Sequence, residues 1–310
     1  MARRKKLFRK QLALQLFVIS GIIYIFIFNY IPMFGLVLAF KDYDMTTGVQ
    51  GIFTSQWVGL AHFREFVNTF GFSNLVRNTV AISVLKLIFA FPLPIIFAIM
   101  LNEMRSLKYK KVVQTCSYLP HFISWVVVSG LSFRFLSSTG IVNTVLERLR
   151  LIEAPIPFLS SADMFWGLAV SLDVWKSMGW WTIIFLAAIA GVNHDLLEAA
   201  SLDGAGRLKR IWHVILPCIK PTIVVVLILA LGNLFGGGLS GSNFEQSFLL
   251  GNAMNAPRSE IIQTYVFRVG LSLGRFDYAT AVGMIQSIIS LILIFTSNFI
   301  AKRVSGTGLF

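Results

Sequence analysis

Long stretches that lack charged side chains dominate this sequence of 310 residues and decide what it can fold into. A bilayer core about 30 Å thick needs roughly 20 apolar residues of helix to cross it. Six stretches reach that length with at most two charged residues each: 11–40, 78–102, 112–133, 164–194, 221–244 and 278–301. They predict six transmembrane helices, near 14–39, 79–101, 113–135, 165–190, 222–240 and 279–300.

The composition agrees with a membrane protein. Hydrophobic residues make up 56% of the chain and charged residues only 13%, and the mean hydropathy is +0.74. A soluble domain carries about a quarter charged residues. These values exclude a cytosolic enzyme, a secreted disulfide scaffold and a disordered tail. We therefore expect an all-α polytopic membrane protein whose transmembrane domain covers residues 14–300.

Basic residues predict the orientation of the helices. The chain has 27 Lys and Arg against 14 Asp and Glu. With a cytoplasmic N-terminus, 16 of the basic residues fall on inside segments and 9 on outside segments, which satisfies the positive-inside rule. Residues 1–13 and 301–310 are then cytoplasmic termini. The adjacent span explains the basic N-terminus, so no nucleic-acid partner is expected. The first apolar run is too long for a cleavable signal peptide.

A segment between the fourth and fifth predicted helices, residues 193–220, is expected to form a cytoplasmic loop with short helices. Asp195 followed by Glu198 is typical of a capping box. Gly204 and Gly206 should interrupt the helix, and Pro217 and Pro221 should end the second helical stretch. Physical chemistry alone leaves two interpretations open, an amphipathic helix on lipid headgroups or a docking element for a soluble partner.

The amino-acid sequence of this loop resembles the EAA signature of ABC importer permeases. Glu198-Ala-Ala200 is followed after three residues by Gly204 and after nine more by Val214-Ile-Leu-Pro217, and only Val214 departs from the usual Ile. The resemblance implies a coupling helix that inserts into a cleft on an ATP-hydrolysing subunit. The coupling residues that it implies are Glu198, Ala199, Ala200, Asp203, Gly204, Leu216 and Pro217.

Other segments extend the resemblance over nearly the whole chain. Residues 29–43 and 56–63 are similar to carbohydrate permeases of the maltose-type importer group. Residues 244–248, 264–268 and 276–283 are similar to the subgroup that handles complex oligosaccharides and polysaccharide fragments, although Asn243 stands where that subgroup often has Gly. The resemblance implies a permease of a type I importer in the bacterial cytoplasmic membrane, which moves an oligosaccharide or polysaccharide fragment by alternating access.

The same resemblance implies several partners. These are a second related permease, a dimer of ATPase subunits and an extracellular solute-binding protein. Two alternatives stay open, namely a permease of the same mechanism for a non-sugar solute, and a membrane-embedded enzyme or assembly factor.

No motif for chemistry on this chain is complete. The sequence has no Gly-x-x-x-x-Gly-Lys-Ser/Thr phosphate loop, and Gly204-Ala-Gly206 completes no dinucleotide fingerprint. The run Gly236-Gly-Gly238 is expected to break the fifth helix. The four histidines follow no Cys/His metal spacing, and Cys116 and Cys218 are expected to be free thiols. We expect no catalytic residue, metal or cofactor here, with ATP and magnesium on the partner ATPase.

Polar side chains inside the spans are the candidates for a substrate pathway, because such groups are costly in lipid. Asp173 and Lys176, three residues apart, could pair with each other or face the cargo. Lys86 could extend to the membrane surface or meet an acidic sugar. Asn233 and Gln286 could bind sugar hydroxyls or bond across a helix interface. The five candidates are Lys86, Asp173, Lys176, Asn233 and Gln286.

Overall fold

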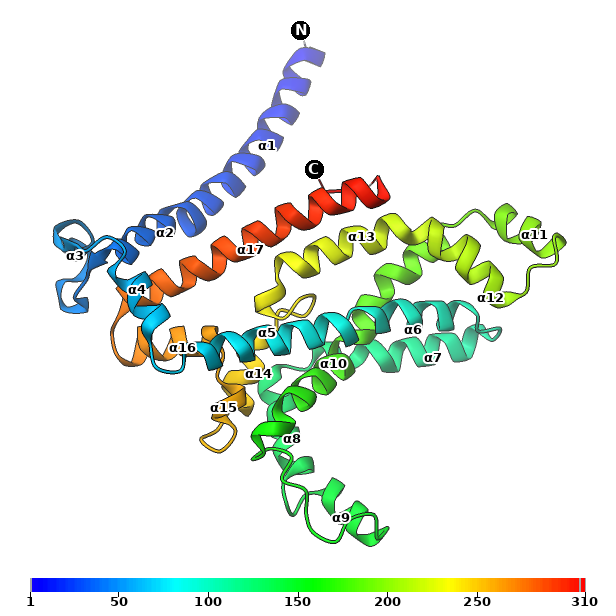
Figure 1. Cartoon of the computed structure of the whole chain (residues 1–310). Coiled ribbons are helices and arrows are strands. Elements are labelled where there is room, and N and C mark those ends of the chain that lie inside the picture. Colours follow the sequence, from blue (N-terminus) through cyan, green and yellow to red (C-terminus); the bar gives the residue numbers. More distant parts are fainter. Residues whose placement is uncertain (1, 307, 310) are drawn as a thin grey trace. The chain divides into compact units, whose positions relative to one another are not determined.

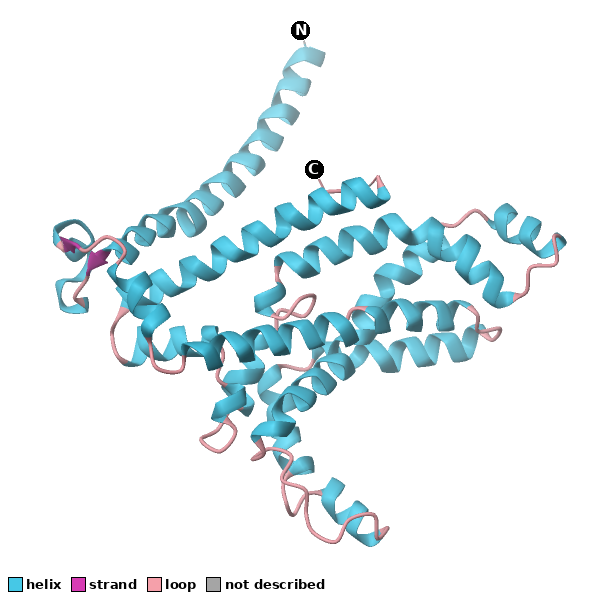
Figure 2. Ribbon diagram, viewed as in Figure 1, coloured by secondary structure: helices cyan, strands magenta, loops and turns pink. Residues whose placement is uncertain are grey.

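A computed structural model describes residues 2–306, 308 and 309, with side chains from residue 11 onward except those of 13, 304 and 305 (Figure 1). Parts of the two predicted cytoplasmic termini, residues 1–13 and 301–310, therefore lie outside the described residues. Helices form almost all of the described chain (Figure 2). Its only strands are β1 (Lys41–Asp42) and β2 (Gln56–Trp57), which pair antiparallel with Lys41 opposite Trp57.

The chain divides into two compact units. Unit 1 runs up to Thr69 and includes Val266–Ile285, and unit 2 covers Phe70–Tyr265 and continues from Gln286. The helices of unit 1 are α1 (Ala2–Ile25), α2 (Ile31–Met33), α3 (Gly48–Thr54), α4 (Ala61–Asn68) and the first part of α17 (Phe276–Ser305). A π-helix (Phe26–Tyr30) and a 3₁₀ helix (Phe34–Phe40) continue α1 and α2 as far as β1.

Unit 2 holds most of the remaining helices. They are α5 (Phe72–Phe89), α6 (Pro92–Asn102), α7 (Leu107–Tyr118), α8 (Trp125–Leu136), α9 (Ile141–Arg148), α10 (Ala162–Ala190), α11 (His194–Leu202), α12 (Arg207–Arg210), α13 (Leu216–Gly232), α14 (Asn243–Leu250) and α15 (Ala256–Ser259). The short helix α16 (Ile262–Phe267) crosses from unit 2 into unit 1.

Six helical segments of the described chain are long and apolar enough to cross a membrane, which confirms the predicted number. They are Leu14–Phe40, Phe72–Asn102, Trp125–Arg148, Ala162–Ala190, Arg207–Gly232 and Phe276–Arg303. The fourth span agrees closely with the predicted 165–190. The third and fifth spans differ from the prediction for local reasons.

The third span is not the continuous helix predicted over 113–135. Helix α7 ends at Tyr118, a 3₁₀ turn covers Leu119–Phe122, and α8 begins at Trp125. Pro120 has no N–H with which to continue the ladder of α7. The Ser124 hydroxyl then accepts a hydrogen bond from the Val127 N–H at 3.3 Å and caps α8. A proline and a serine thus divide an apolar stretch that hydropathy alone reads as one helix.

The fifth span begins earlier and ends earlier than the predicted 222–240. Pro217 and Pro221 do not end the preceding helix, because a π-helix (Ile211–Ile215) joins α12 to α13 and both prolines lie within α13. The two prolines lack a backbone N–H, and the wider π turn before them lets the helix continue without those two hydrogen bonds. The helix ends at Gly232, so the glycine run 236–238 lies in a turn beyond it, where Gly237 has φ +112°.

Two apolar clusters hold unit 2 together. One joins α5, α10 and α14 around Ile82, Phe165 and Leu250. The other joins α6, α10 and α13 around Ala98, Phe185 and Ile219. Helix α10 belongs to both clusters, so its side chains are fixed along most of its length. It is the rigid element on which the polar residues described below are arranged.

Candidate functional site

One largely exposed segment of unit 2 is a helix–glycine–helix element, residues 193–210, which we call the knob. Its first helix, α11, begins after Asn193, whose side-chain oxygen accepts a hydrogen bond from the Asp195 N–H at 3.0 Å. The predicted capping box of Asp195 and Glu198 is therefore wrong, because the cap lies two residues earlier. Glu198 instead pairs across the helix surface with His194 at 3.4 Å, and both side chains are exposed.

Gly204 ends α11 in a turn that only glycine adopts without strain. Its φ is +76°, and it donates a backbone hydrogen bond to Ser201 while Ala205 donates to Ala200 at 2.9 Å. This pair of bonds is the Schellman pattern of a helix C-terminus. Arg210 of α12 then donates to the Ser201 hydroxyl at 2.9 Å, which fixes the second helix of the knob against the first.

The knob presents large apolar side chains to solvent. Leu202 is 89% exposed and Leu208 is 73% exposed, and Trp212 just beyond α12 is also largely exposed. On the opposite side, Leu197 and Ile211 pack against the α6–α10–α13 cluster and anchor the knob to the spans. An anchored element with apolar side chains outside is typical of a surface that another protein covers.

Five of the predicted coupling residues lie in the knob, and the other two, Leu216 and Pro217, are the first residues of α13. Ala199, Asp203 and Pro217 are exposed, whereas Ala200 and Leu216 are partly buried. Leu216 packs against the same apolar cluster as Leu197. The motif therefore has an outward part around Glu198 and Gly204 and an inward part that joins it to α13.

A second polar arrangement is buried inside unit 2, and we call it the buried junction. Lys86 of α5 donates to the Ser242 hydroxyl at 2.8 Å, and Ser242 donates to the Asp173 carboxylate of α10 at 2.7 Å. The Lys86 Nζ and Asp173 Oδ1 atoms are 3.7 Å apart. All three side chains are at least 98% buried. Charge-assisted hydrogen bonds thereby join α5, α10 and the loop after α13.

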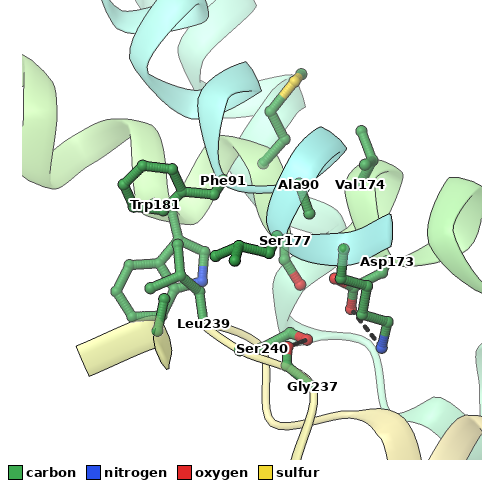
Figure 3. A pocket seen from close by; sticks show the side chains of 14 residues that line it. Ala90, Phe91, Asp173, Val174, Ser177, Trp181, Gly237, Leu239 and Ser240 are labelled. Atoms are coloured by element: carbon green, nitrogen blue, oxygen red, sulfur yellow. Dashed lines mark hydrogen bonds and ion pairs between the residues drawn. The ribbon is translucent and has the colours of Figure 1, made fainter. Parts of the chain in front are cut away.

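A small cavity adjoins the buried junction. Figure 3 shows Asp173, Ser177 and Ser240 on its wall, with Trp181 and Leu239 opposite. Its volume of about 20 Å³ is room for roughly one water molecule. A cavity of this size does not admit a sugar.

These contacts correct two expectations about the charged residues. Lys86 does not extend to the membrane surface, because its ammonium is buried against Asp173. Asp173 does not pair with Lys176, which instead donates to the His121 carbonyl at 2.7 Å and lies 5.6 Å from the centre of the Trp125 ring. Residue spacing on one helix could not reveal either partner, since both come from other helices.

The remaining two pathway candidates differ from each other. Asn233 follows the last residue of α13, and its amide donates to the Gly238 carbonyl at 2.9 Å, so it stabilises the glycine turn. Gln286 lies half-buried on α17, and its amide makes no hydrogen bond within the described part of the chain. Of the two amide candidates, Asn233 is thus bonded within the chain, whereas the Gln286 amide has no hydrogen-bond partner among the described residues.

His121 contacts α10 in two ways. Its carbonyl accepts the hydrogen bond from Lys176, and its ring stacks on the Trp180 ring with centroids 4.5 Å apart.

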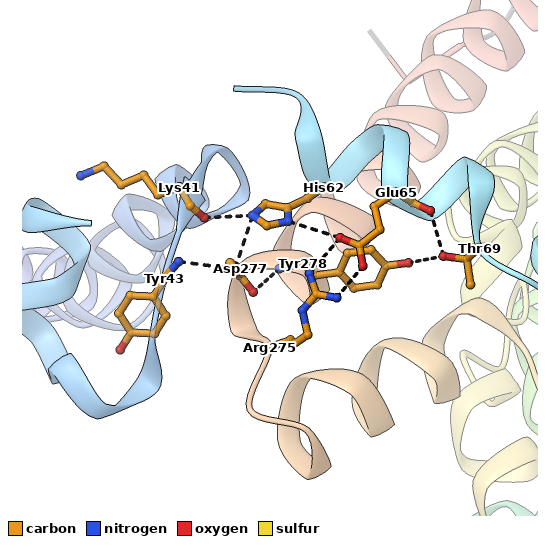
Figure 4. Close-up of polar contacts among 8 residues, drawn as sticks. All are labelled: Lys41, Tyr43, His62, Glu65, Thr69, Arg275, Asp277 and Tyr278. Atoms are coloured by element: carbon orange, nitrogen blue, oxygen red, sulfur yellow. Dashed lines mark hydrogen bonds and ion pairs between the residues drawn. The ribbon is translucent and has the colours of Figure 1, made fainter. Parts of the chain in front are cut away.

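Unit 1 contains a polar network that the sequence did not single out (Figure 4). His62 lies 3.3 Å from Asp277 and 3.0 Å from the Lys41 carbonyl, and Asp277 accepts from the Tyr43 N–H. Arg275 forms two hydrogen bonds with Glu65, one of them 2.8 Å long. The hydrogen bond from Arg275 lowers the pKa of the Glu65 carboxyl.

A signal for this network was present in the sequence. The residues come from three of the segments that carry the family resemblance, 29–43, 56–63 and 276–283, or lie within two residues of them. Read separately, the segments gave no contact. In the fold they meet in one network (Figure 4).

No group of three or more His, Cys, Asp or Glu residues that could hold a metal is found among the described residues. Cys116 and Cys218 are both exposed and free.

Known proteins share this architecture. Residues 90–306 match the family model of the binding-protein-dependent transport system inner membrane component. Protein LplB of Bacillus subtilis is 43% identical over 96% of this chain and 91% of its own length. The polygalacturonan/rhamnogalacturonan transport system permease protein YteP of Bacillus subtilis is 42% identical over 99% of this chain and 94% of its own.

A solved structure agrees over the same extent. One chain of a bacterial ABC transporter involved in the import of the acidic polysaccharide alginate superposes with a TM-score of 0.86. It is 37% identical, and the match covers 98% of this chain and 99% of that one. A second structure of this kind holds the alginate transporter in complex with a periplasmic protein that carries an alginate pentasaccharide.

Proposed function

This chain belongs to the family of binding-protein-dependent transport system inner membrane components, and from that premise we propose that it imports an oligosaccharide or polysaccharide fragment as one permease of an ABC transporter. YteP is named as a permease for polygalacturonan and rhamnogalacturonan, and the alginate transporter is involved in the import of an acidic polysaccharide. Among other relatives, the AraP proteins are permeases for arabinooligosaccharides.

The observation that carries the proposal is the form of the knob. The coupling motif lies on an exposed element with a Schellman turn at Gly204 and apolar side chains directed to solvent. A soluble partner that covers Leu202 and Leu208 would bury apolar area and be attracted by the basic side chains of α12. We infer that this partner is an ATPase subunit.

The ATPase would be a dimer that binds ATP and magnesium, and this chain would contribute no catalytic residue. Nucleotide-driven movement of the ATPase would displace the knob, and the continuous helix from Arg207 to Gly232 would carry that displacement into the membrane. The partner must bind the two permease states with different affinity, since otherwise nucleotide would shift no equilibrium.

The other proposed partners follow from the family. A second related permease would complete the translocation pathway, and an extracellular solute-binding protein would deliver the cargo. The distribution of basic residues supports cytoplasmic N- and C-termini, with the knob on the cytoplasmic side. We assign Gln286 as the best pathway candidate, because its amide is free to bind a sugar hydroxyl.

Exchange of Glu198 tests the proposal. We expect Glu198→Ala to lower cargo-dependent uptake about tenfold or more in cells whose own copy is deleted, because loss of a central contact weakens docking by that order. Glu147→Ala is the matched control, since Glu147 is an exposed glutamate on α9 far from the motif in sequence. Pull-down of the ATPase by the purified permease gives the direct measurement.

Two rival functions predict different results. A permease for a non-sugar solute would keep the ATPase and the effect of Glu198→Ala, while the deletion strain would take up oligosaccharides normally. A membrane-embedded enzyme or assembly factor would lose neither partner binding nor uptake when Glu198 is replaced.

A further inference from the structure

A long apolar groove runs along the membrane-spanning part of unit 2 between α5 and α10. Two cavities of about 820 and 450 Å³ meet at Leu85. Apart from Arg77 and two serines, the lining consists of apolar side chains, tryptophans and glycine. No side chain of the described residues fills this groove, so it is open to a lipid or to a neighbouring helix.

The floor of the groove is open at Gly167 of α10. A methyl group added to Gly167 would meet no heavy atom within 4 Å apart from its own helix. Val170 and Val174 continue the same helix face and also line the groove. A flexible hydrocarbon chain can follow such a surface and gain dispersion contacts along it.

One end of the groove carries a positive charge without a carboxylate partner. Arg77 is exposed on the cavity wall, and no acidic side chain pairs with it in the described part of the chain. The neighbouring Arg258 differs, because Asp163 pairs with it at 2.8 Å. Trp166 lies below both guanidinium groups, 6.0 Å from Arg77 and 4.6 Å from Arg258. A tryptophan beside arginines is typical of the headgroup region of a membrane.

The lining of the groove along α5 and the start of α6 runs from Phe72 to Leu93. At 1.5 Å for each residue this is about 31 Å, close to the thickness of a hydrocarbon core of about 30 Å. The part from Arg77 to Phe89 is about 18 Å long, a little more than one leaflet. A lipid with its headgroup at Arg77 would fill that part, and the charge of Arg77 favours an anionic headgroup over an apolar helix.

We propose that this groove binds an anionic phospholipid, with the headgroup phosphate on Arg77 and an acyl chain between α5 and α10 beside Gly167. The site uses residues apart from the coupling motif and the polar pathway candidates. It rests on the proposed function only for the direction of the chain in the membrane, which places the Arg77 end in the outer leaflet.

Native mass spectrometry of the complete purified transporter tests the site. The transporter is held in nanodiscs that contain equal amounts of phosphatidylglycerol and phosphatidylcholine, and the retained lipids are counted after release. We expect Arg77→Gln to lower retained phosphatidylglycerol about fivefold, the effect of one cation near an anionic headgroup. Phosphatidylcholine should change little.

Two further variants separate the headgroup from the chain. Gly167→Leu places a Cβ atom where no heavy atom lies within 4 Å, and its side chain should fill part of the groove and lower the retention of both lipids. The helix should be at least as stable, because leucine is a better helix former than glycine. Arg148→Gln, at an exposed arginine of α9, is the control and should change nothing. The Pro257 carbonyl that Arg77 contacts keeps its hydrogen bond from Asn78 at 3.1 Å, so Arg77→Gln should fold.

Equal retention of phosphatidylglycerol in wild type and Arg77→Gln would overturn the headgroup assignment. Unchanged lipid in Gly167→Leu, or a helix of the second permease in the groove, would overturn the acyl-chain assignment. If only the proposed function is wrong, a different result is expected. Oligosaccharide uptake would then be unchanged when this chain is deleted, while the retained phosphatidylglycerol would still fall in Arg77→Gln.

Discussion

The knob and the buried junction are both polar elements of unit 2, but they are built in opposite ways. The knob is made from one contiguous segment, and its largest apolar side chains, such as Leu202, face solvent. The buried junction is made from three segments distant in sequence, and Lys86, Asp173 and Ser242 are shielded from solvent and bonded to one another. We propose that a partner covers the first, whereas the polar groups of the second are paired with one another within the chain. Exchanges in the knob should therefore affect assembly, and exchanges in the junction should affect folding.

The largest expected effect on stability is at the buried junction. Asp173→Leu leaves the Lys86 ammonium buried without a counter-charge, so we expect it to lower the free energy of unfolding by about 3–5 kcal/mol. Lys86→Met should have a similar effect. The double variant should recover much of the loss, because an apolar pair of similar size needs no counter-charge.

Thermal unfolding of the four proteins in detergent measures this double-mutant cycle. Glu198→Gln serves as the control, since it removes one charge from an exposed ion pair, where the expected change is below about 1 kcal/mol. Additive losses in the double variant would mean that Lys86 and Asp173 act independently, contrary to the junction described here.

A glycine inside the packed helices should give the next largest effect. A Cβ atom at Gly179 of α10 would come within 2.1 Å of the Ser117 carbonyl oxygen, so Gly179→Ala must push α7 and α10 apart. We expect a loss of about 1–3 kcal/mol, typical of overpacking. Gly206→Ala in the knob is the control, because its surroundings are open and its φ is −66°. Equal thermal stability of the two variants would contradict the close packing at Gly179.

Gly204→Ala should have a smaller effect with a different cause. The space around Gly204 is open, but its φ of +76° is unfavourable for alanine by about 1–2 kcal/mol. Because the strain is local, we expect the end of α11 to fray and the spans to remain folded. Hydrogen exchange of the Gly204 and Ala205 amides measures this, and unchanged exchange would show that the Schellman turn tolerates alanine.

The knob and the junction also differ in how far the sequence could predict them. The motif in the knob is contiguous and has fixed spacing, so the turn at Gly204 could be predicted from it, while the coupling role of its residues stays a prediction. The number of spans followed from hydropathy in the same way. The partners of Lys86 and Lys176 could not be predicted, because Asp173 and Ser242 are 87 and 156 residues from Lys86 and the His121 carbonyl belongs to another helix.

Interruptions within the spans were the other limit. Hydropathy averages over a window, so it cannot distinguish Pro120, which ends a helix, from Pro221, which lies inside one. The outcome depends on neighbours, namely the Ser124 cap in the third span and the π-helix before α13 in the fifth. The network of His62, Glu65, Arg275 and Asp277 needed the tertiary fold as well, because its two halves are about 210 residues apart.

The smallest expected change in stability belongs to the apolar side chains of the knob, and it tests the comparison most directly. Leu208→Ala removes a side chain that is 73% exposed, so the free energy of unfolding should change by less than about 0.5 kcal/mol. If a partner covers Leu208, the same exchange should weaken binding of the ATPase by about tenfold, since a buried leucine at an interface contributes on that scale. Leu149→Ala is the control, because Leu149 is similarly exposed beside α9, outside the knob. Measuring unfolding and ATPase binding on the same preparations separates the two effects. A loss of stability without a loss of binding would place Leu208 with the buried junction, in the class of residues that serve the fold.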